Sequence, residues 1–244
     1  MTSGSRQTRR LALIGLGKMG RTLAQLAPAH GFQVVAQIDH EANAGGRGVT
    51  AESLAGADVA IEFTVPGSAR GNVKAAVSAG CPVVVGTTGW YEALPELSAW
   101  VQSNAGAMLW APNFSLGVNV FERVVAYAAT LLAGAPGFDA HLIETHHSAK
   151  KDAPSGTART LAAAAAAGWG RAVPITSVRT GAVPGTHELL FDAPFETIRL
   201  EHVARDRRVF AEGALVAARW LVGRRGVFTM RDVLEQPPSS SDRA

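Results

Sequence analysis

The sequence has little cysteine, little excess charge of either sign and no long apolar run. Its 244 residues include a single cysteine, Cys81, which excludes an internal disulfide. Lysine and arginine outnumber aspartate and glutamate by only three, 23 against 20, and they are scattered along the chain. This distribution argues against a nucleic-acid partner, although a mild positive balance suits small carboxylated or phosphorylated molecules.

No stretch approaches the roughly 20 apolar residues that cross a bilayer, and the first residues are polar, unlike a signal peptide. We therefore expect no membrane partner and a cytoplasmic location. Hydrophobic residues make up 47% of the chain and charged residues 18%, which favours a globular protein over a disordered one. Cys81 stands at the start of an apolar run and is expected to be a buried strand residue.

Short apolar runs alternate with helix-like segments through the first half of the chain. This order predicts a parallel sheet with helices on both faces, the doubly wound α/β class. The expected strands are residues 11–15, 32–38, 59–63, 83–85 and 107–110, and the expected helices are residues 18–30, 72–79 and 94–102.

The rhythm changes after Pro112, which indicates a second domain from about residue 116. Glycine and proline between its later segments favour a mixed or antiparallel sheet. A helix at residues 209–221 is expected to pack back on the first domain, and the tail at 237–241 to be disordered. The other expected elements are helices at 118–132 and after 157, and strands at 140–145, 175–180, 187–191 and 197–203.

A glycine-rich turn follows the first expected strand and opens the first helix. Gly15, Gly17 and Gly20 fit the pattern G-x-G-x-x-G, with Lys18 and Met19 inside it. The first glycine permits a tight turn, the second lets the backbone approach a pyrophosphate, and the third lets helix and strand pack closely. The helix N-terminus offers N–H groups to the anion. This context predicts a Rossmann-like site for a dinucleotide, NADH or NADPH.

Asp39 ends the second expected strand about 20 residues after the glycine turn. A carboxylate there accepts hydrogen bonds from the adenosine ribose and repels a 2′-phosphate, and the next residue is His40 rather than an arginine. We therefore predict that NADH is preferred over NADPH, with Arg47 able to reach back and moderate the preference. The alternative is a solvated loop aspartate.

Two further strand ends carry candidate cofactor residues. Gly86, Thr87 and Thr88 follow one strand at the carboxyl edge of the sheet, where ligands of doubly wound folds bind. Phe63 and Thr64 occupy the same edge one strand earlier and are candidates to flank the nicotinamide ribose. Both segments are also compatible with simple strand-terminating turns.

The segment 144–158 is dense with reactive groups. His146 and His147 supply a proton donor near neutral pH, Lys150 and Lys151 supply positive charge for carboxylates, and residues 155–157 place N–H groups and a hydroxyl at a helix start. This pattern predicts an acid-base site that binds an anion. Adjacent histidines on an extended chain point apart and no further ligand lies at metal spacing, so we expect no metal. A purely structural polar loop stays open as the alternative.

The same segment, Glu144 to Ala158, resembles the signature of the dihydrodipicolinate (4-hydroxy-tetrahydrodipicolinate) reductase family, E-x-H-H-x-x-K-x-D-x-P-S-G-T-A, without a gap. Further blocks match in order along the chain: residues 15–20, 62–64, 86–89, 111–120 and 179–187. The family acts in lysine and diaminopimelate biosynthesis.

The resemblance implies NAD(P)H-dependent reduction of 4-hydroxy-tetrahydrodipicolinate, a small dicarboxylate, to tetrahydrodipicolinate. It implies a dinucleotide-binding domain of residues 1–116 and 206–244, an α+β substrate and oligomerisation domain of residues 117–205 with a mixed open sheet, and a homotetramer. It adds Asn113 and Phe114 to the cofactor site.

The resemblance also assigns roles in the reactive segment. His146 becomes the acid that protonates the reduced substrate, Lys150 a carboxylate ligand that assists proton delivery, and His147, Gly156 and Thr157 substrate contacts. Lys150 is chosen over Lys151 by its position in the motif alone. Two other functions remain to be weighed, an amino-acid dehydrogenase such as aspartate dehydrogenase and a catalytically silent NAD-binding sensor. The complete reactive segment disfavours both.

Overall fold

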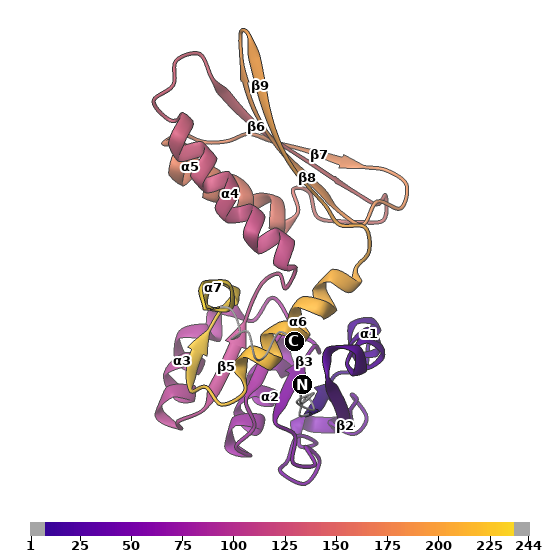
Figure 1. Ribbon diagram of the computed structural model, residues 1–244. Helices are drawn as coiled ribbons and strands as arrows, with labels where there is room; N and C mark the ends of the chain where they lie inside the picture. The colour runs from indigo at the N-terminus through magenta and orange to yellow at the C-terminus, as the bar shows by residue number, and fades with distance from the viewer. Residues whose placement is uncertain (1–7, 237–244) are drawn as a thin grey trace, which may run out of the picture. The chain divides into compact units, whose positions relative to one another are not determined.

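A computed structural model of the chain describes residues 8–236 (Figure 1). The predicted disordered tail therefore lies outside the described residues. The chain forms two compact units: unit 1 runs to Ser115 and resumes at Phe210, and unit 2 is Leu116–Val209. Among the residues described, no helix has both the length and the apolar character needed to cross a membrane.

Unit 1 contains a parallel sheet of six strands in the order β10-β5-β4-β3-β1-β2. Its strands are β1 (Arg9–Ile14), β2 (Phe32–Ile38), β3 (Val59–Glu62), β4 (Val83–Val85), β5 (Ala107–Trp110) and β10 (Gly226–Phe228). Its helices are α1 (Lys18–Leu26), α2 (Pro66–Ser78), α3 (Leu94–Ser103), α6 (Arg208–Leu221) and α7 (Met230–Glu235), with short 3₁₀ turns at Pro28–His30, Ala44–Gly46 and Tyr91–Ala93.

Every residue of β3 and β4 is buried, as expected of central strands covered on both faces. The apolar side chains of the sheet pack against α2 and α3 on one face, around Val73, Leu97 and Val101. Successive strands are added to the sheet in opposite directions on the two sides of β1. The strand β2 lies on one side of β1, and β3 lies on the other. Doubly wound sheets bind ligands at such a switch point.

Unit 2 contains a mixed sheet of four strands in the order β7-β6-β8-β9, in which only β6 and β7 run parallel. Its elements are α4 (Leu116–Leu132), β6 (Asp139–His146), α5 (Gly156–Trp169), β7 (Ile175–Arg179), β8 (Thr186–Ala193) and β9 (Glu196–Val203). Helices α4 and α5 lie side by side along one face of the sheet (Figure 1). Burial along β6 alternates residue by residue, so the face away from the helices is less buried, and no element of unit 2 (Leu116–Val209) covers it.

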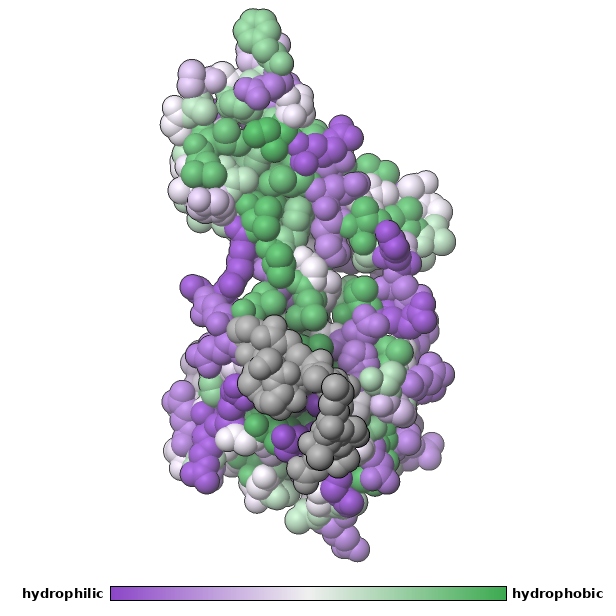
Figure 2. All heavy atoms as spheres, viewed as in Figure 1, coloured by the Kyte–Doolittle hydropathy of each residue, from purple (hydrophilic) through white to green (hydrophobic). Residues whose placement is uncertain are grey.

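An apolar stripe runs along the outer side of α4 (Figure 2). Val120, Val124, Tyr127 and Leu131 recur at helical spacing and are all exposed, Tyr127 to 67%.

The fold class is the predicted one, and several details differ from expectation. The helix expected at 18–30 ends at Leu26, and Pro28 begins a separate 3₁₀ turn. Helix α2 starts at Pro66 rather than residue 72, because proline suits the first helical turn and Val65 is extended. The strand β10 and helix α7 were not expected. Cys81 is buried, as predicted, but lies two residues before β4 rather than in a strand, and burial raises the pKa of its thiol to about 12.

Candidate active site

A cavity of about 1460 Å³ opens at the carboxyl edge of the unit 1 sheet. Its walls come from the turn after β1, the end of β2 with the loop that follows, and the segment after β3. These strand ends flank the switch point of the sheet. The volume exceeds that of an ordinary small-molecule pocket and suits a dinucleotide.

The glycine turn at this cavity has the geometry of an anion site. Gly17 precedes α1 and no side chain caps that helix, so the first N–H groups lack a side-chain acceptor. A Cβ at Gly17 would meet nothing within 4 Å, which leaves the backbone open to approach. A Cβ at Gly15 would overlap the carbonyl of Phe63, and one at Gly20 would overlap the carbonyl of Gly15. The turn therefore fits a pyrophosphate and excludes side chains at its two tight positions.

Four of the predicted cofactor residues line this cavity: Gly15, Gly17, Asp39 and Phe63. The other predicted cofactor residues do not line it: Lys18, Met19, Gly20, Gly86, Thr87, Thr88, Asn113 and Phe114. Their direct contact with a cofactor remains a prediction.

Several residues of the second group support the wall of the cavity. The ring of Phe63 lies against Gly86, where a Cβ would overlap it, and stands edge-on to the ring of Phe114 at 6.1 Å. The hydroxyl of Thr87 accepts a hydrogen bond of 2.7 Å from the N–H of Thr64. The strand-end residues thus fix the segment after β3.

Sequence analysis did not identify Arg21, Gln37, Asn43 or Ser68, which also line the cavity. Arg21 directly follows the glycine turn, so its place in the motif was a usable signal. Asn43 reaches the cavity through a loop whose path no local pattern specifies.

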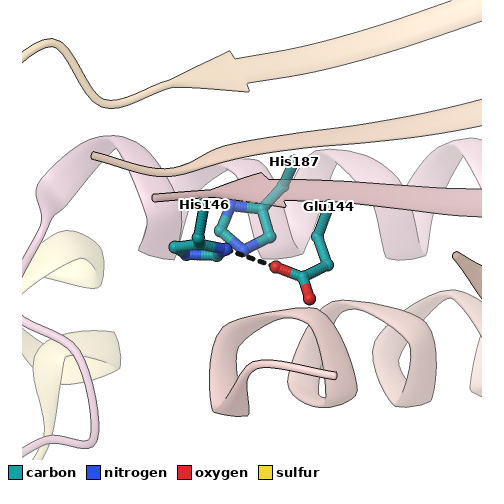
Figure 3. A group of neighbouring side chains, drawn as sticks. All are labelled: Glu144, His146 and His187. Carbon is teal, nitrogen blue, oxygen red and sulfur yellow. Dashed lines mark hydrogen bonds and ion pairs between the residues drawn. The ribbon is translucent and has the colours of Figure 1, made fainter. Parts of the chain in front are cut away.

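Three buried ionisable side chains meet in unit 2, from β6 and β8 (Figure 3). Glu144 and His146 are two residues apart on β6 and therefore share a face, and His187 on β8 is the register partner of Glu144. Oε2 of Glu144 is hydrogen-bonded to Nδ1 of His146. The rings of His146 and His187 lie 5.3 Å apart in an edge-to-face arrangement.

Glu144 is fully buried and has several compensating partners. Its Oε1 accepts hydrogen bonds from Nη2 of Arg179 at 2.7 Å and from the N–H of Ser155 at 3.3 Å. Burial alone would raise the pKa of this carboxyl, but hydrogen bonds from Arg179, Ser177 and His146 lower it to about 2. Glu144 is therefore an anion at neutral pH, and it fixes the orientation of the His146 ring.

Arg179 also holds the loop that carries the predicted lysine. Its Nη2 donates to the carbonyl of Asp152 at 2.6 Å, and Asp152 in turn pairs with Nζ of Lys150 at 2.7 Å. Lys150 is half-buried in this loop, whereas Lys151 is exposed. Lys150 lies near enough to His146 for its charge to lower the pKa of that histidine.

Nε2 of His146 lies beside Gly185, which has no side chain. A Cβ at Gly185 would lie 3.1 Å from Nε2, so a side chain there would crowd this nitrogen. The predicted anion contacts Gly156 and Thr157 form the first turn of α5, after the capping residue Ser155. His147 is half-buried directly after β6.

His187 is only 4% exposed, and its Nδ1 has no hydrogen-bond partner among the residues described. Its Nε2 lies 3.4 Å from Oγ of Ser155. Burial, helped by the charge of His146, lowers the pKa of His187 to about 4. His187 is therefore neutral at pH 7, which leaves His146 to carry any proton in the cluster.

The ligand atoms of Glu144, His146 and His187 lie within 4.8 Å of one another, close enough for a metal ion. However, Glu144 is already bonded to Arg179 and His146, and a guanidinium beside the site would repel a divalent cation. The donor set therefore favours a proton relay over a metal centre.

Two family models together match almost all of the chain. The model described as dihydrodipicolinate reductase, N-terminus, matches residues 9–114, and the model described as dihydrodipicolinate reductase, C-terminus, matches residues 117–234. The chain belongs to the dihydrodipicolinate reductase family.

Curated members of this family are similar along their whole length. The 4-hydroxy-tetrahydrodipicolinate reductase of Christiangramia forsetii is 34% identical over 236 residues, covering 92% of this chain and 97% of the relative. The enzyme of the same name from Stenotrophomonas maltophilia strain R551-3 is 41% identical over 234 residues, covering 90% and 94%. The family predicted from sequence is confirmed, and with it the reductase reaction and the NAD(P)H cofactor.

Solved structures show the same fold. Dihydrodipicolinate reductase from Paenisporosarcina sp. TG-14, with dipicolinate bound, has a TM-score of 0.76 at 23% identity and covers 91% of this chain and 97% of its own. The aspartate dehydrogenase of Thermotoga maritima has a TM-score of 0.52 at 10% identity, covering 88% and 97%. This second likeness concerns architecture alone.

The buried His187 should make the stability of the reductase depend on pH. Its folded-state pKa lies below the ordinary value near 6.5, so the unfolded chain binds the proton more readily. The stabilisation is complete above about pH 6.5 and is lost as pH falls, by about 2 kcal/mol between pH 7 and pH 5. We expect His187→Gln to lose about 2 kcal/mol less than wild type over this range, as measured by urea unfolding.

The matched control for this experiment is His40→Gln, which removes an exposed histidine from unit 1. This variant should lose as much stability as wild type on acidification. Equal losses in the His187→Gln variant and wild type would contradict the prediction.

Proposed function

We propose that the chain reduces 4-hydroxy-tetrahydrodipicolinate with NADH as the preferred donor, with the cofactor bound in unit 1 and the substrate in unit 2. The observation that carries this proposal is the buried relay of Arg179, Glu144 and His146 beside Lys150, in a chain that also has an uncapped glycine turn at a large cavity. The relay supplies a proton, and the cavity fits the donor of a hydride. A silent nucleotide sensor would need no such relay.

His146 is proposed as the acid that completes the reduction. Loss of the 4-hydroxyl of the substrate as water gives a conjugated imine, and a bound nicotinamide would supply the hydride that reduces it. The resulting electron-rich, enamine-like carbon must then be protonated. Because Nδ1 of His146 is engaged by Glu144, the proton is delivered from Nε2, the nitrogen that faces Gly185. Burial lowers the pKa of His146, and a dicarboxylate bound nearby opposes this effect by favouring the imidazolium.

Lys150 and the start of α5 are proposed to bind the two carboxylates. Lys150 is half-buried and pairs with Asp152, an exposed carboxylate that a substrate carboxylate can replace. Gly156 and Thr157 stand at the helix N-terminus, where N–H groups and the helix dipole favour an anion. His147 is proposed as a further contact.

Substitutions in the relay should separate chemistry from cofactor binding. We expect His146→Gln to lower kcat roughly 100-fold or more, because proton transfer is lost, and Lys150→Ala to raise KM for the dicarboxylate about tenfold. Both variants should bind NADH like wild type, measured by fluorescence. Lys151→Ala is the matched control and should be near wild type. Near-normal turnover in His146→Gln, or equal effects of the two lysine variants, would refute these roles.

The NADH preference is proposed from the position of Asp39. Asp39 lines the cavity directly after β2, at the start of the loop that follows, whereas Arg47 does not line it. One carboxylate oxygen of Asp39 accepts the N–H of Ala42 at 2.8 Å, which holds the side chain in place for a ribose. Arg21 is a cavity-lining cation that can weaken the preference.

This preference is measured as kcat/KM for NADH and NADPH, by loss of absorbance of the reduced nicotinamide. The substrate is made fresh from pyruvate and aspartate semialdehyde by the preceding synthase. Asp39→Ala removes a hydrogen-bond acceptor for the ribose and a charge that repels a 2′-phosphate, and each interaction contributes about 1 kcal/mol. The ratio of kcat/KM for NADH to that for NADPH should therefore fall roughly tenfold or more. Glu41→Ala, an exposed neighbour outside the cavity, should leave the ratio unchanged. A wild-type protein that uses NADPH as well as NADH would contradict the proposal.

We further propose a cytoplasmic homotetramer that assembles through the uncovered face of the unit 2 sheet. Support for assembly comes from apolar side chains on this face, including Ile143 and the exposed Val178 and Val203. The cytoplasmic location rests on the family's biosynthetic role.

Sedimentation of wild type should give the mass of four chains, and Val178→Lys should lower it because a charge would be buried between sheets. Tyr127→Lys, on the apolar stripe of α4, is the control and should remain tetrameric. Dissociation caused by Tyr127→Lys instead would move the interface to α4, and a monomeric wild type would refute assembly.

A further inference from the structure

A second buried carboxyl lies in unit 1, directly before the segment Phe63–Val65 that lines the cavity. Glu62 is the last residue of β3 and is completely buried. Its register partners are Ile14, directly before the glycine turn, and Val85, directly before the Gly86 turn. Glu62 therefore lies at the switch point of the sheet, between the strand ends that lead into the glycine turn and the Gly86 turn.

One oxygen of Glu62 receives two hydrogen bonds. Its Oε1 accepts from the hydroxyl of Thr64 and from Nδ2 of Asn72, the latter at 3.2 Å. Asn72 is itself buried on α2, and its Oδ1 accepts from Nδ2 of Asn43 at 2.7 Å. Oδ1 of Asn43 then accepts the N–H of Gly48 at 2.9 Å. A continuous chain of hydrogen bonds thus runs from Glu62 to the loop after β2.

These hydrogen bonds connect two separate walls of the cavity. Thr64 lies in the segment after β3, and Asn43 lies in the loop that begins with Asp39; all three line the cavity. The N–H of Asn43 donates to the carbonyl of Asp39 at 3.0 Å, so the position of Asn43 affects the proposed ribose ligand. Glu62 is hydrogen-bonded directly to Thr64 in one wall and, through Asn72, to Asn43 in the other.

Glu62 has none of the charge compensation that Glu144 has. Burial raises its pKa, and the neighbouring Thr64, Thr87 and Asn72 side chains lower it only in part. Its Oε2 is buried and has no hydrogen-bond partner within the described chain. Burial therefore shifts Glu62 toward the neutral form, and in either form Oε1 can accept both hydrogen bonds.

We propose that Glu62 is a positioning residue for the cofactor, holding the Thr64 wall and the Asp39 loop together through its hydrogen bonds. The inference rests on the proposed function, because it assumes that the cavity binds NADH. The raised pKa of this carboxyl also suits a dinucleotide, since less negative charge near the switch point means less repulsion of a pyrophosphate.

Two substitutions at Glu62 separate hydrogen bonding from charge. Glu62→Gln keeps the accepting carbonyl at Oε1 and places its amide nitrogen where the unpaired Oε2 stood, so NADH affinity should stay within about twofold of wild type. Glu62→Leu keeps the volume but removes the acceptor, and it should raise KM for NADH about tenfold. In this variant, kcat at saturating NADH and KM for the dicarboxylate should be unchanged.

The adenosine half of the cofactor provides a second readout. Calorimetry with ADP-ribose should give weaker binding to Glu62→Leu. The hydrogen bonds from Glu62 through Asn72 to Asn43, here called the Asn72–Asn43 arm, hold the loop that begins with Asp39. Asn43→Ala, at the far end of the arm and only half-buried, should weaken ADP-ribose severalfold and leave reduced nicotinamide mononucleotide unaffected. This variant decides the question if Glu62→Leu does not fold.

The outcomes distinguish the inference from the proposed function. A wild-type protein that binds no NADH refutes the function, and the inference with it. If wild type binds NADH and folded Glu62→Leu binds NADH and ADP-ribose equally well, only the inference fails. Glu62→Gln as weak as Glu62→Leu would show that charge matters, and unchanged ADP-ribose binding in Asn43→Ala would refute the arm.

Discussion

A carboxylate without water must find compensating partners within the protein, and unit 2 is organised around one that does. Glu144 receives hydrogen bonds from Arg179 on β7, from the N–H of Ser155 before α5, and from His146 on its own strand. Arg179 extends this arrangement to the carbonyl of Asp152. One buried anion therefore fixes the His146 ring, the loop beside it and the start of a helix, so these parts are oriented together.

The two buried glutamates illustrate two ways of burying a carboxyl. Glu144 keeps its charge because a guanidinium and a histidine are hydrogen-bonded to it, and that charge orients the ring of His146, the proposed acid. Glu62 has only hydroxyl and amide neighbours, which favours the neutral form. The difference matches the ligands proposed for each unit: a proton donor benefits from a nearby anion, whereas a pyrophosphate site does not.

Local sequence patterns predicted much of the fold, but they did not predict elements and contacts that depend on residues far apart in the chain. The strands β2, β4 and β5 were predicted to the residue because each is an apolar run between turn signals. The strand β10 is three half-buried residues, too short to carry a period, and it exists only because β5 offers an edge. In the site, the motif predicted His146, but Arg179 reaches Glu144 across 35 positions, which no spacing rule specifies.

The return of the chain to unit 1 also bears on how the protein is made. Unit 2 is one continuous segment, Leu116–Val209, whereas the six-stranded sheet is complete only after β10 has been added. On the ribosome, unit 2 can therefore finish folding first, while the edge of β5 has not yet paired with its last partner, β10. In nascent chains stalled before residue 226, unit 2 would be folded while the sheet of unit 1 still lacked β10. The unpaired edge of β5 would then be accessible to chaperones or to aggregation.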